Sequence, residues 1–157
     1  MRHLFLLLVL PLSLFSQGVT WDPLQPLLGQ TLTITYNTSE GTLPEGASQV
    51  ILHWAEYDSD TGNWILPPEE NWPDGSSSPD GFALQSPLVQ GDVAWTVEIP
   101  STVEMQEIAF VFTDGQGNWD NNSNENWILT YMSDEEICYW SPLEPETGDL
   151  LTLTYNA

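Results

Sequence analysis

Short runs of alternating residues, each closed by a turn-forming cluster, limit this chain to few folds. Apolar and polar residues alternate with a period of two at 31–36 and 94–99, as in a strand with one buried face. Further strands are expected at 49–57, 64–66, 108–113 and 127–131, and shorter ones near 82–84 and 87–89. No window of eleven or more residues keeps a helical apolar stripe. The sequence therefore predicts an all-β fold, an antiparallel sandwich or barrel.

The charge of the chain excludes several classes of partner. The 157 residues hold 23 acidic side chains and a single Lys or Arg residue, Arg2, which gives a formal net charge of −22. Phosphate repels such a chain, so nucleic acid and anionic membranes are excluded as partners. Eight tryptophans in so short a chain, beside many Asn, Asp and Thr side chains, favour a neutral ligand rich in hydroxyl groups.

The first 18 residues have the pattern of a secretory signal peptide. Arg2 provides a short basic start, residues 4–15 are almost wholly apolar, and Ser16 and Gly18 are small residues that fit cleavage after Gly18. We therefore expect a secreted, extracellular product.

An internal repeat sets the domain boundaries. Segment 21–37 recurs as 140–156, with ten of seventeen positions identical at an offset of 119 residues, which indicates tandem copies. The expected organisation is a signal peptide at 1–18, one complete module at 19–133, and the start of a second, truncated copy at 134–157. That copy stops after the equivalent of the strand at 31–36. One strand cannot bury its apolar face alone, so residues after about Ser133 should pack poorly or borrow an edge of the first module.

Two loops combine tryptophan with amide side chains. Trp119, Asn121 and Asn122 follow a Gly-rich turn at the end of one strand, and Trp64 ends a turn of its own. His53 lies on the strand that leads into the second turn. A flat indole offers an apolar face to a sugar ring, and amides or a neutral imidazole can bind vicinal hydroxyls. We expect these five residues to form a carbohydrate site on adjacent loops at one end of the fold.

The motifs around these residues resemble family 25 starch-binding carbohydrate-binding modules. The order runs from Trp-x-Pro and Thr-x-Tyr-Asn, through Leu-His and Asn-Trp, to Phe-Val-Phe-Thr-Asp-Gly and Asn-Trp-Asp-Asn-Asn, over residues 21–131. The resemblance implies an immunoglobulin-like β-sandwich that binds starch and maltooligosaccharides through α-1,4-linked glucose. It also implies a platform of His53, Trp64 and Trp119 with Asn122 nearby, and an amylase-type catalytic domain elsewhere in the parent chain.

The sequence departs from the family pattern at the first platform tryptophan. Trp54 directly follows His53, where the family usually has a glycine shortly afterwards, and an acidic insert at 58–60 lengthens the turn before Trp64. Trp54 is therefore an alternative to Trp64 in the platform.

Acidic turns raise the question of a metal. Asp58, Asp60 and Asp114 lie in segments whose spacing is similar to that of Ca²⁺ ligands, but neither segment completes an EF-hand pattern. We predict no cofactor and no metal centre, and leave open a structural calcium ion that stabilises the fold.

Two other functions remain to be weighed. One is a calcium-stabilised adhesion or surface module of a secreted protein, and the other is a fragment of a glycoside hydrolase. The carboxylates are scattered over turns and no Gly-x-Ser-x-Gly motif is present, which argues against catalysis. The sequence thus predicts a non-catalytic module that binds starch and targets a linked hydrolase to the polysaccharide. Further modules in the same chain would raise the affinity through effective concentration.

Overall fold

β-Strands form most of the regular structure in the computed structural model, which describes residues 18–102, 105–133, 138–141 and 152–155. Short 3₁₀ helices lie at Glu69–Asn71 and Asn122–Asn124. No helix in this described part is long and apolar enough to span a membrane. The strands are β1 (Val19–Asp22), β2 (Leu32–Tyr36), β3 (Ile51–Asp58), β4 (Asn63–Ile65), β5 (Leu84–Pro87), β6 (Val89–Gln90), β7 (Trp95–Ile99), β8 (Glu107–Thr113), β9 (Trp119–Asp120), β10 (Trp127–Thr130), β11 (Cys138–Ser141) and β12 (Thr152–Tyr155).

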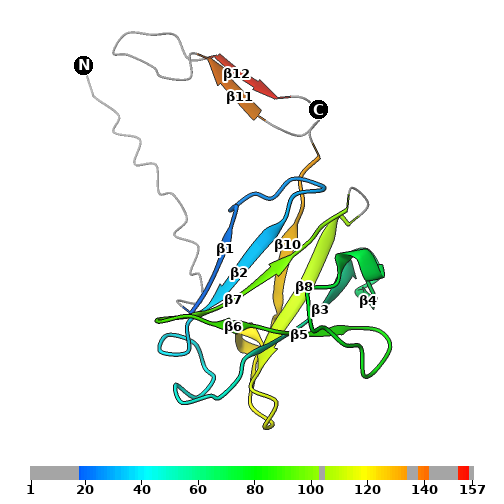
Figure 1. Ribbon diagram of the computed structural model, residues 1–157. Coiled ribbons are helices and arrows are strands. Elements are labelled where there is room, and N and C mark those ends of the chain that lie inside the picture. Colours follow the sequence, from blue (N-terminus) through cyan, green and yellow to red (C-terminus); the bar gives the residue numbers. More distant parts are fainter. Residues whose placement is uncertain (1–17, 103–104, 134–137, 142–151, 156–157) are drawn as a thin grey trace, which may run out of the picture.

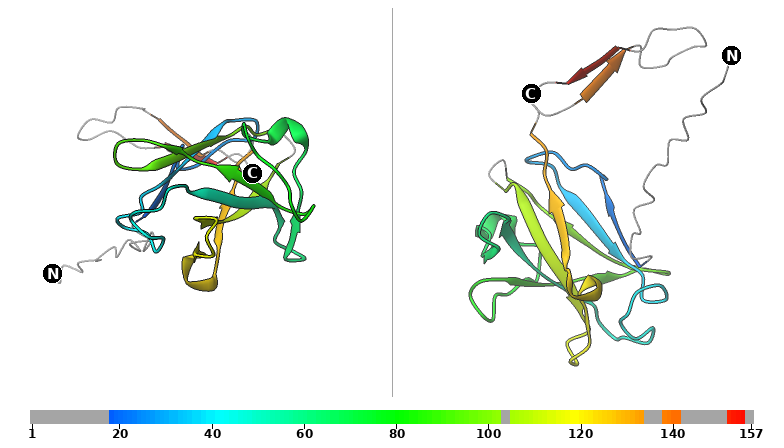
Figure 2. Two further views of the ribbon diagram at one scale, coloured as in Figure 1. Left: turned by 60° about the horizontal axis from the view of Figure 1, so that its bottom comes forward. Right: turned by 180° about the vertical axis from the view of Figure 1, so that it is seen from behind.

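Strands β1 to β10 build two sheets that enclose one core. The first sheet has the order β1-β2-β7-β6, and the second has the order β10-β8-β3-β4, with β5 beside β3 and β9 beside β8. Every pairing of these named strands is antiparallel. Figure 1 shows β1, β2 and β7 in front of β8 and β10, and the right-hand view of Figure 2 shows the same layers from behind. The predicted antiparallel β-sandwich is confirmed.

The core between the sheets follows from the alternation along the strands. In β2, Leu32, Ile34 and Tyr36 are buried, whereas the two threonines between them are half-buried. In the opposite sheet, the ring of Phe110 stacks on Trp127, with 5.8 Å between the ring centroids. Burying one large apolar side chain contributes about 1.5–3 kcal/mol, so rows of this kind hold the two sheets together.

Trp54 belongs to this core. Its side chain is fully buried (0 % exposed), and its indole Nε1 donates a 2.9 Å hydrogen bond to the hydroxyl of Ser86. Successive side chains of a strand point to opposite faces, so Trp54 faces inward where His53 faces outward. The suggestion that Trp54 takes the place of Trp64 in a ligand platform is therefore wrong.

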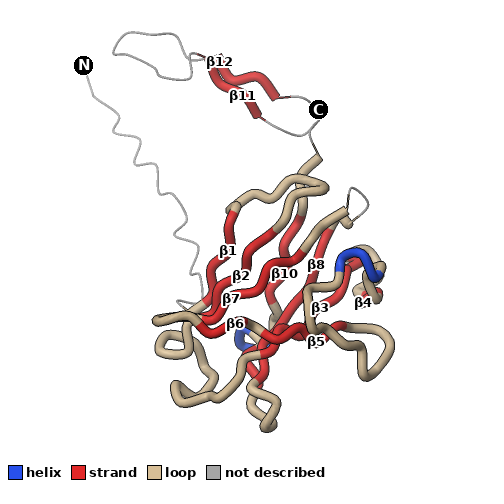
Figure 3. The backbone as a smooth tube through the Cα atoms, viewed as in Figure 1, coloured by secondary structure: helices blue, strands red, loops and turns tan. Residues whose placement is uncertain are grey.

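The long segment 67–92 carries the chain from one sheet to the other. It contains a 3₁₀ turn and then β5 and β6, which belong to different sheets, close to the short strands that the sequence predicts. Leu88 lies between β5 and β6, is buried, and donates from its backbone N–H to the carbonyl of Val50 over 2.8 Å. Figure 3 shows the loops of this segment between its strands. The short strands β1 and β9 have no clear alternation, and the sequence analysis did not predict them.

The chain enters and leaves the sandwich at opposite ends. Gly18 is buried beside the end of β2, where its carbonyl accepts a 2.7 Å hydrogen bond from the Asn37 N–H. After β10, the Met132 N–H donates to the Pro26 carbonyl over 2.8 Å, near the start of β2. In Figure 1, β1 accordingly begins at the lower end of the sandwich and β10 ends at the upper end. Gly18, which the sequence analysis assigns to the leader, thus packs as part of the domain.

Strands β11 and β12 repeat the first hairpin of the chain. Cys138 pairs with Tyr155 and Ser141 with Thr152, whereas Val19 pairs with Tyr36 and Asp22 with Thr33. Each residue of the later hairpin lies 119 positions after its counterpart, so the sequence repeat is also a repeat of register. The segment that the sequence assigns to a second copy therefore contains two described strands rather than the one predicted. Among the described strands, β11 and β12 pair only with each other and borrow no edge of the first module.

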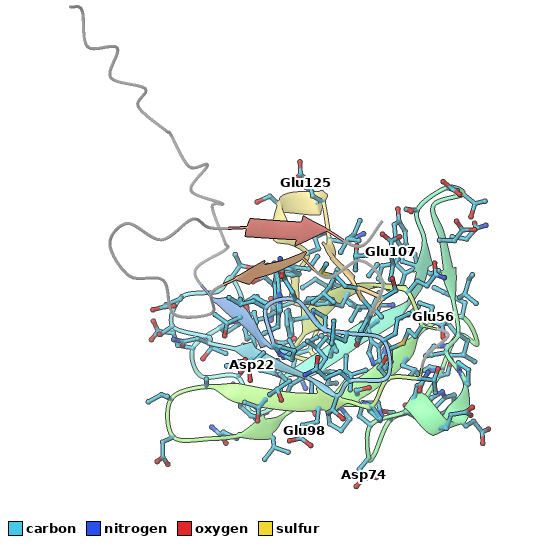
Figure 4. The ribbon with its side chains drawn as sticks, turned by 90° about the horizontal axis from the view of Figure 1, so that it is seen from above. Asp22, Glu56, Asp74, Glu98, Glu107 and Glu125 are labelled. Carbon is cyan, nitrogen blue, oxygen red and sulfur yellow. The ribbon has the colours of Figure 1, made fainter. Side chains whose placement is uncertain are left out.

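Acidic side chains are spread around the sandwich, and the described residues include no Lys or Arg. The single Lys or Arg residue of the chain, Arg2, lies outside the described residues. Repulsion between like charges therefore opposes folding. Figure 4 labels acidic side chains that lie well apart around the molecule: Asp22, Glu56, Asp74, Glu98, Glu107 and Glu125.

Sodium chloride is expected to raise the melting temperature of the domain. Salt screens charges over about 10 Å at 0.1 M, and here the surface charges repel. We expect a rise of roughly 5 °C between low salt and 0.5 M NaCl, measured by circular dichroism at pH 7. At pH 4, where many carboxyl groups are protonated, the increase should shrink. A melting temperature that falls as NaCl is added at pH 7 would contradict this account.

Candidate functional site

His53 lies at the centre of the outer face of the second sheet. In β3, Leu52 and Trp54 face the core, so His53 between them faces away from it. His53 lies opposite Val111 of β8 on one side and opposite Gln85 of β5 on the other. It thus stands in the middle of a sheet, with paired strands on both sides.

Two tryptophans reach this histidine from opposite ends of the sheet. Trp64 of β4 lies opposite Tyr57, and Trp119 of β9 lies opposite Thr113. Strands β3 and β8 run antiparallel, so the β3–β4 and β8–β9 turns lie at opposite ends of the pair. The expected placement of both tryptophans on adjacent loops at one end of the fold is therefore wrong.

The ring geometry around His53 is nevertheless compact. The Trp64 ring stacks beside the imidazole, with 5.6 Å between centroids and 28° between the planes. The Trp119 ring meets the imidazole edge-on, with 5.6 Å between centroids and 86° between the planes. The structure therefore brings together three of the five residues that the sequence predicts for the site.

A third aromatic side chain, Phe82, completes the cluster. Its ring centroid lies 6.5 Å from that of His53, at an interplanar angle of 88°. Asp80 fixes the preceding turn, because one of its carboxylate oxygens accepts from the backbone N–H of Phe82 (3.1 Å) and of Ala83 (3.0 Å). The sequence predicts a short strand near 82–84, although the Asp-Gly turn just before Phe82 is also a signal for an exposed ring. We call His53, Trp64, Phe82 and Trp119 the aromatic cluster.

The aromatic cluster is open to solvent. Trp119 and Phe82 are each 49 % exposed, and His53 and Trp64 are half-buried. A shallow pocket of about 440 Å³ lies at the cluster, lined by His53, Gly62, Asn63, Trp64, Phe82 and Asn126. Larger pockets, of about 570 and 530 Å³, lie elsewhere but contain no comparable group of aromatic side chains. Grouped exposed aromatic rings mark a surface for recognition, so the smaller pocket is the better candidate.

His53 is a neutral polar group at this site. Burial lowers the pKa of His53 below its usual value of 6.5, and the nearby Asp80 carboxylate offsets part of that shift. The imidazole is therefore uncharged at pH 7, with one nitrogen that donates and one that accepts. Its Nδ1 is buried and has no hydrogen-bond partner in the described part of the chain.

The structure uses the amides of Asn121 and Asn122 within their own loop. Asn121 Oδ1 accepts from the Asn124 N–H (3.1 Å), and Asn122 Nδ2 donates to the Asn126 carbonyl (2.9 Å). Neither residue lines the pocket, whereas Asn63 and Asn126 do. Neither Asn63 nor Asn126 is among the ligand-binding residues that the sequence predicts. Asn122 instead supports the backbone of Asn126 at the rim.

Backbone conformation explains why asparagine is so frequent in this loop. The φ angles of Asn122, Ser123, Asn124 and Asn126 are 51°, 61°, 74° and 59°. Asparagine enters this left-handed region more readily than most residues because its short polar side chain can bond locally. The run of asparagines that the sequence suggests as a hydroxyl-binding motif is therefore also explained by the left-handed backbone of this loop.

The acidic candidates for metal ligands act as acceptors in turns. Asp58 accepts from Asp60 N–H (3.0 Å), Thr61 N–H (3.2 Å) and Thr61 Oγ1 (2.7 Å). The Thr61 hydroxyl is the main reason that the pKa of Asp58 lies below its usual value. Asp58 is the last residue of β3 and Asp60 lies in the β3–β4 turn, whereas the turn that holds Asp114 lies beside the start of β3. The two acidic turns are therefore at opposite ends of the β3–β8 pair.

Asp114 has the same kind of role in the β8–β9 turn. It accepts from the Gln116 and Asn118 N–H groups (2.8 and 3.1 Å) and from the Asn118 side-chain amide (2.6 Å). The Asn118 amide is the main reason that the pKa of Asp114 lies below its usual value. Within the described residues, no three His, Cys, Asp or Glu side chains converge to hold a metal ion.

A two-layer antiparallel sandwich is the architecture of immunoglobulin-like domains. Residues 34–131 match the model of one such family, the Ig-like N-terminal domain of alpha-glucan water dikinase 1. The chain belongs to this family. The comparisons gave no match among the curated proteins and none among the solved structures.

The family match bears on three expectations from the sequence. The immunoglobulin-like fold is confirmed. The matched domain is a non-catalytic accessory module, which is the kind of module that the sequence predicts. The match is to a module of a starch-related protein, in agreement with the coarse assignment, and not to the family 25 modules that the motifs resemble.

Proposed function

We propose that this domain binds starch and related α-1,4-glucans at the aromatic cluster and performs no reaction there. The observation that carries the proposal is the meeting of Trp64 and Trp119 at one His53 ring, each with 5.6 Å between centroids, on an exposed sheet face. Rings that face solvent in this way offer apolar surface to the CH faces of sugars.

The ring angles favour a curved polysaccharide over a flat one. Trp64 lies within 28° of the imidazole plane, whereas Trp119 lies at 86° to it, so the two indoles are far from coplanar. A ligand that stacks on both must turn between them. An α-1,4-glucan turns along its helix, whereas a flat β-linked ribbon would contact only one ring. The geometry therefore supports starch over cellulose.

Charge and polarity support the same class of ligand. The described domain contains no Lys or Arg side chain, so an anionic sugar would be repelled. Neutral His53 and the amides of Asn63 and Asn126 at the pocket provide donors and acceptors without charge. The family is named for an enzyme of α-glucan, and the motifs resemble starch-binding modules, both of which favour this assignment.

The wider role rests on the repeat. We propose that the hairpin of β11 and β12 begins a second copy of the domain, and that tandem copies bind one polysaccharide with raised affinity through effective concentration. We also propose that the protein is secreted and that its modules hold a linked hydrolase at starch.

Retention on granular starch, compared with microcrystalline cellulose, tests the proposal. We expect the protein to sediment with starch and not with cellulose. Trp119→Ala and Trp64→Ala should each weaken binding by about 2 kcal/mol, roughly thirtyfold, because a few rigid aromatic side chains dominate an interface of this kind. The titration is measured with maltoheptaose by calorimetry.

Val93→Ala is the matched control for these variants. Val93 is 85 % exposed, in the turn between β6 and β7 of the other sheet, and the change should leave binding within twofold. Equal retention of wild type and Trp119→Ala on starch would refute the assigned site. Retention on cellulose alone would refute the ligand class.

A further inference from the structure

One acidic residue differs from the other acids of the described domain in its surroundings. Asp120 follows Trp119 directly, is 3 % exposed, and lies opposite Phe112 in the β8–β9 pair. Because the side chains of a strand alternate, Trp119 points to the aromatic cluster while Asp120 points into the core. The two residues of β9 thus join the exposed site to the interior.

The carboxylate of Asp120 joins the two sheets. Its Oδ2 accepts from the Tyr36 hydroxyl over 2.8 Å and from the Thr42 N–H over 2.9 Å, and its Oδ1 accepts from the Asn122 N–H over 3.4 Å. Tyr36 lies on β2 in the opposite sheet, and its own oxygen accepts from the Leu43 N–H over 3.1 Å. A carboxylate is costly to bury, and no Lys or Arg side chain of the described domain can offset that cost here. These hydrogen bonds therefore fix Asp120 to one position.

Strand β9 needs such an anchor. It is two residues long and pairs only with Phe112 and Thr113 at the end of β8. So short a pairing does not by itself hold an exposed indole in one place. A site that stacks one ligand on two rings is sensitive to displacements of about 0.5 Å in either ring.

We infer that Asp120 is a positioning residue for Trp119: its buried carboxylate, bonded to Tyr36 and Thr42, sets where the indole stands relative to His53 and Trp64. This inference rests on the proposed function for its effect on binding, but the position of Trp119 can be measured without ligand.

The test uses Asp120→Asn, which keeps the size but replaces the carboxylate with a neutral amide, a weaker acceptor for the Tyr36 hydroxyl and the Thr42 N–H. The full chain is labelled with 5-fluorotryptophan, and the Trp119 fluorine resonance is assigned with Trp119→Phe. Trp95 of the core, assigned with Trp95→Phe, serves as the internal reference. We expect the Trp119 resonance to shift or broaden while that of Trp95 stays, and the Kd for maltoheptaose to rise about tenfold.

Glu98→Gln is the control for the change of an acid to its amide. Glu98 is an exposed acid of β7 in the opposite sheet, and it does not line the pocket at the aromatic cluster. This variant should change the Kd less than twofold and leave the Trp119 resonance in place. If Asp120→Asn does not fold, Tyr36→Phe removes the same contact from the other side and should shift the same resonance.

The outcomes separate this inference from the proposed function. An unchanged Trp119 resonance in Asp120→Asn overturns the inference, as does a shift of the Trp119 and Trp95 resonances together, which would indicate general loosening. A wild-type protein that does not bind maltoheptaose refutes the proposed function, while a selective shift of the Trp119 resonance would still support the positioning role.

Discussion

Replacing Trp54 with alanine is expected to lower the free energy of unfolding by about 3–5 kcal/mol, the range for a large aromatic side chain removed from a core. Trp54 is fully buried, and its indole N–H bonds to Ser86, so the change leaves a cavity and removes a buried hydrogen bond. Single domains are stable by only about 5–15 kcal/mol in total. A large share of the molecules should therefore be unfolded at moderate urea, as measured by circular dichroism.

Trp64→Ala is the contrasting variant. Trp64 is half-buried on the outer face, so its removal should change stability by less than about 1 kcal/mol while it weakens binding of maltoheptaose. The two tryptophans lie ten positions apart along the chain, yet Trp54→Ala should lower stability and Trp64→Ala should lower affinity. A Trp54→Ala protein with wild-type stability and lost binding would reverse the assigned roles.

Gly41→Ala is expected to destabilise the domain by about 3 kcal/mol through overpacking. A methyl group at this position would overlap the Tyr36 hydroxyl and lie 2.5 Å from its Cζ. The tyrosine cannot move aside, since it is fully buried and bonds to Asp120 over 2.8 Å. The midpoint of urea unfolding should fall accordingly.

Gly46→Ala is the control for this effect, because a methyl group there would meet nothing within 4 Å. In addition, a Tyr36→Phe background should reduce the penalty of Gly41→Ala, because the overlapping hydroxyl is gone. Equal midpoints for Gly41→Ala and Gly46→Ala would contradict the close approach of Gly41 to Tyr36.

Local patterns were sufficient to predict most of the sandwich. The alternation at 31–36 and 94–99 became β2 and β7, whose buried and half-buried residues also alternate. The same rule could have excluded Trp54 from the site, because it is the strand neighbour of outward-facing His53. β1 and β9 were missed because four or two residues are too few to show a period.

The arrangement of the site depended on information that is not local. Trp64 and Trp119 reach His53 only because β4 and β9 pair beside opposite ends of β3 and β8, and pairing register is set by the whole sheet. Phe82 and Asn126 come from turns that carry no sugar motif. The amides of Asn121 and Asn122 satisfy their own loop, which a sequence does not distinguish from readiness to bind a ligand.

The opposite entry and exit points have a consequence for any array of such domains. In an array of such domains, the preceding domain would join at the Gly18 end and the following domain at the Met132 end. The aromatic cluster lies on the face of a sheet, so neither neighbour would need to cover it. A binding surface at either end of the sandwich would instead face the neighbouring domain. Under the proposed function, each domain of the array would therefore keep its aromatic cluster open to the same polysaccharide.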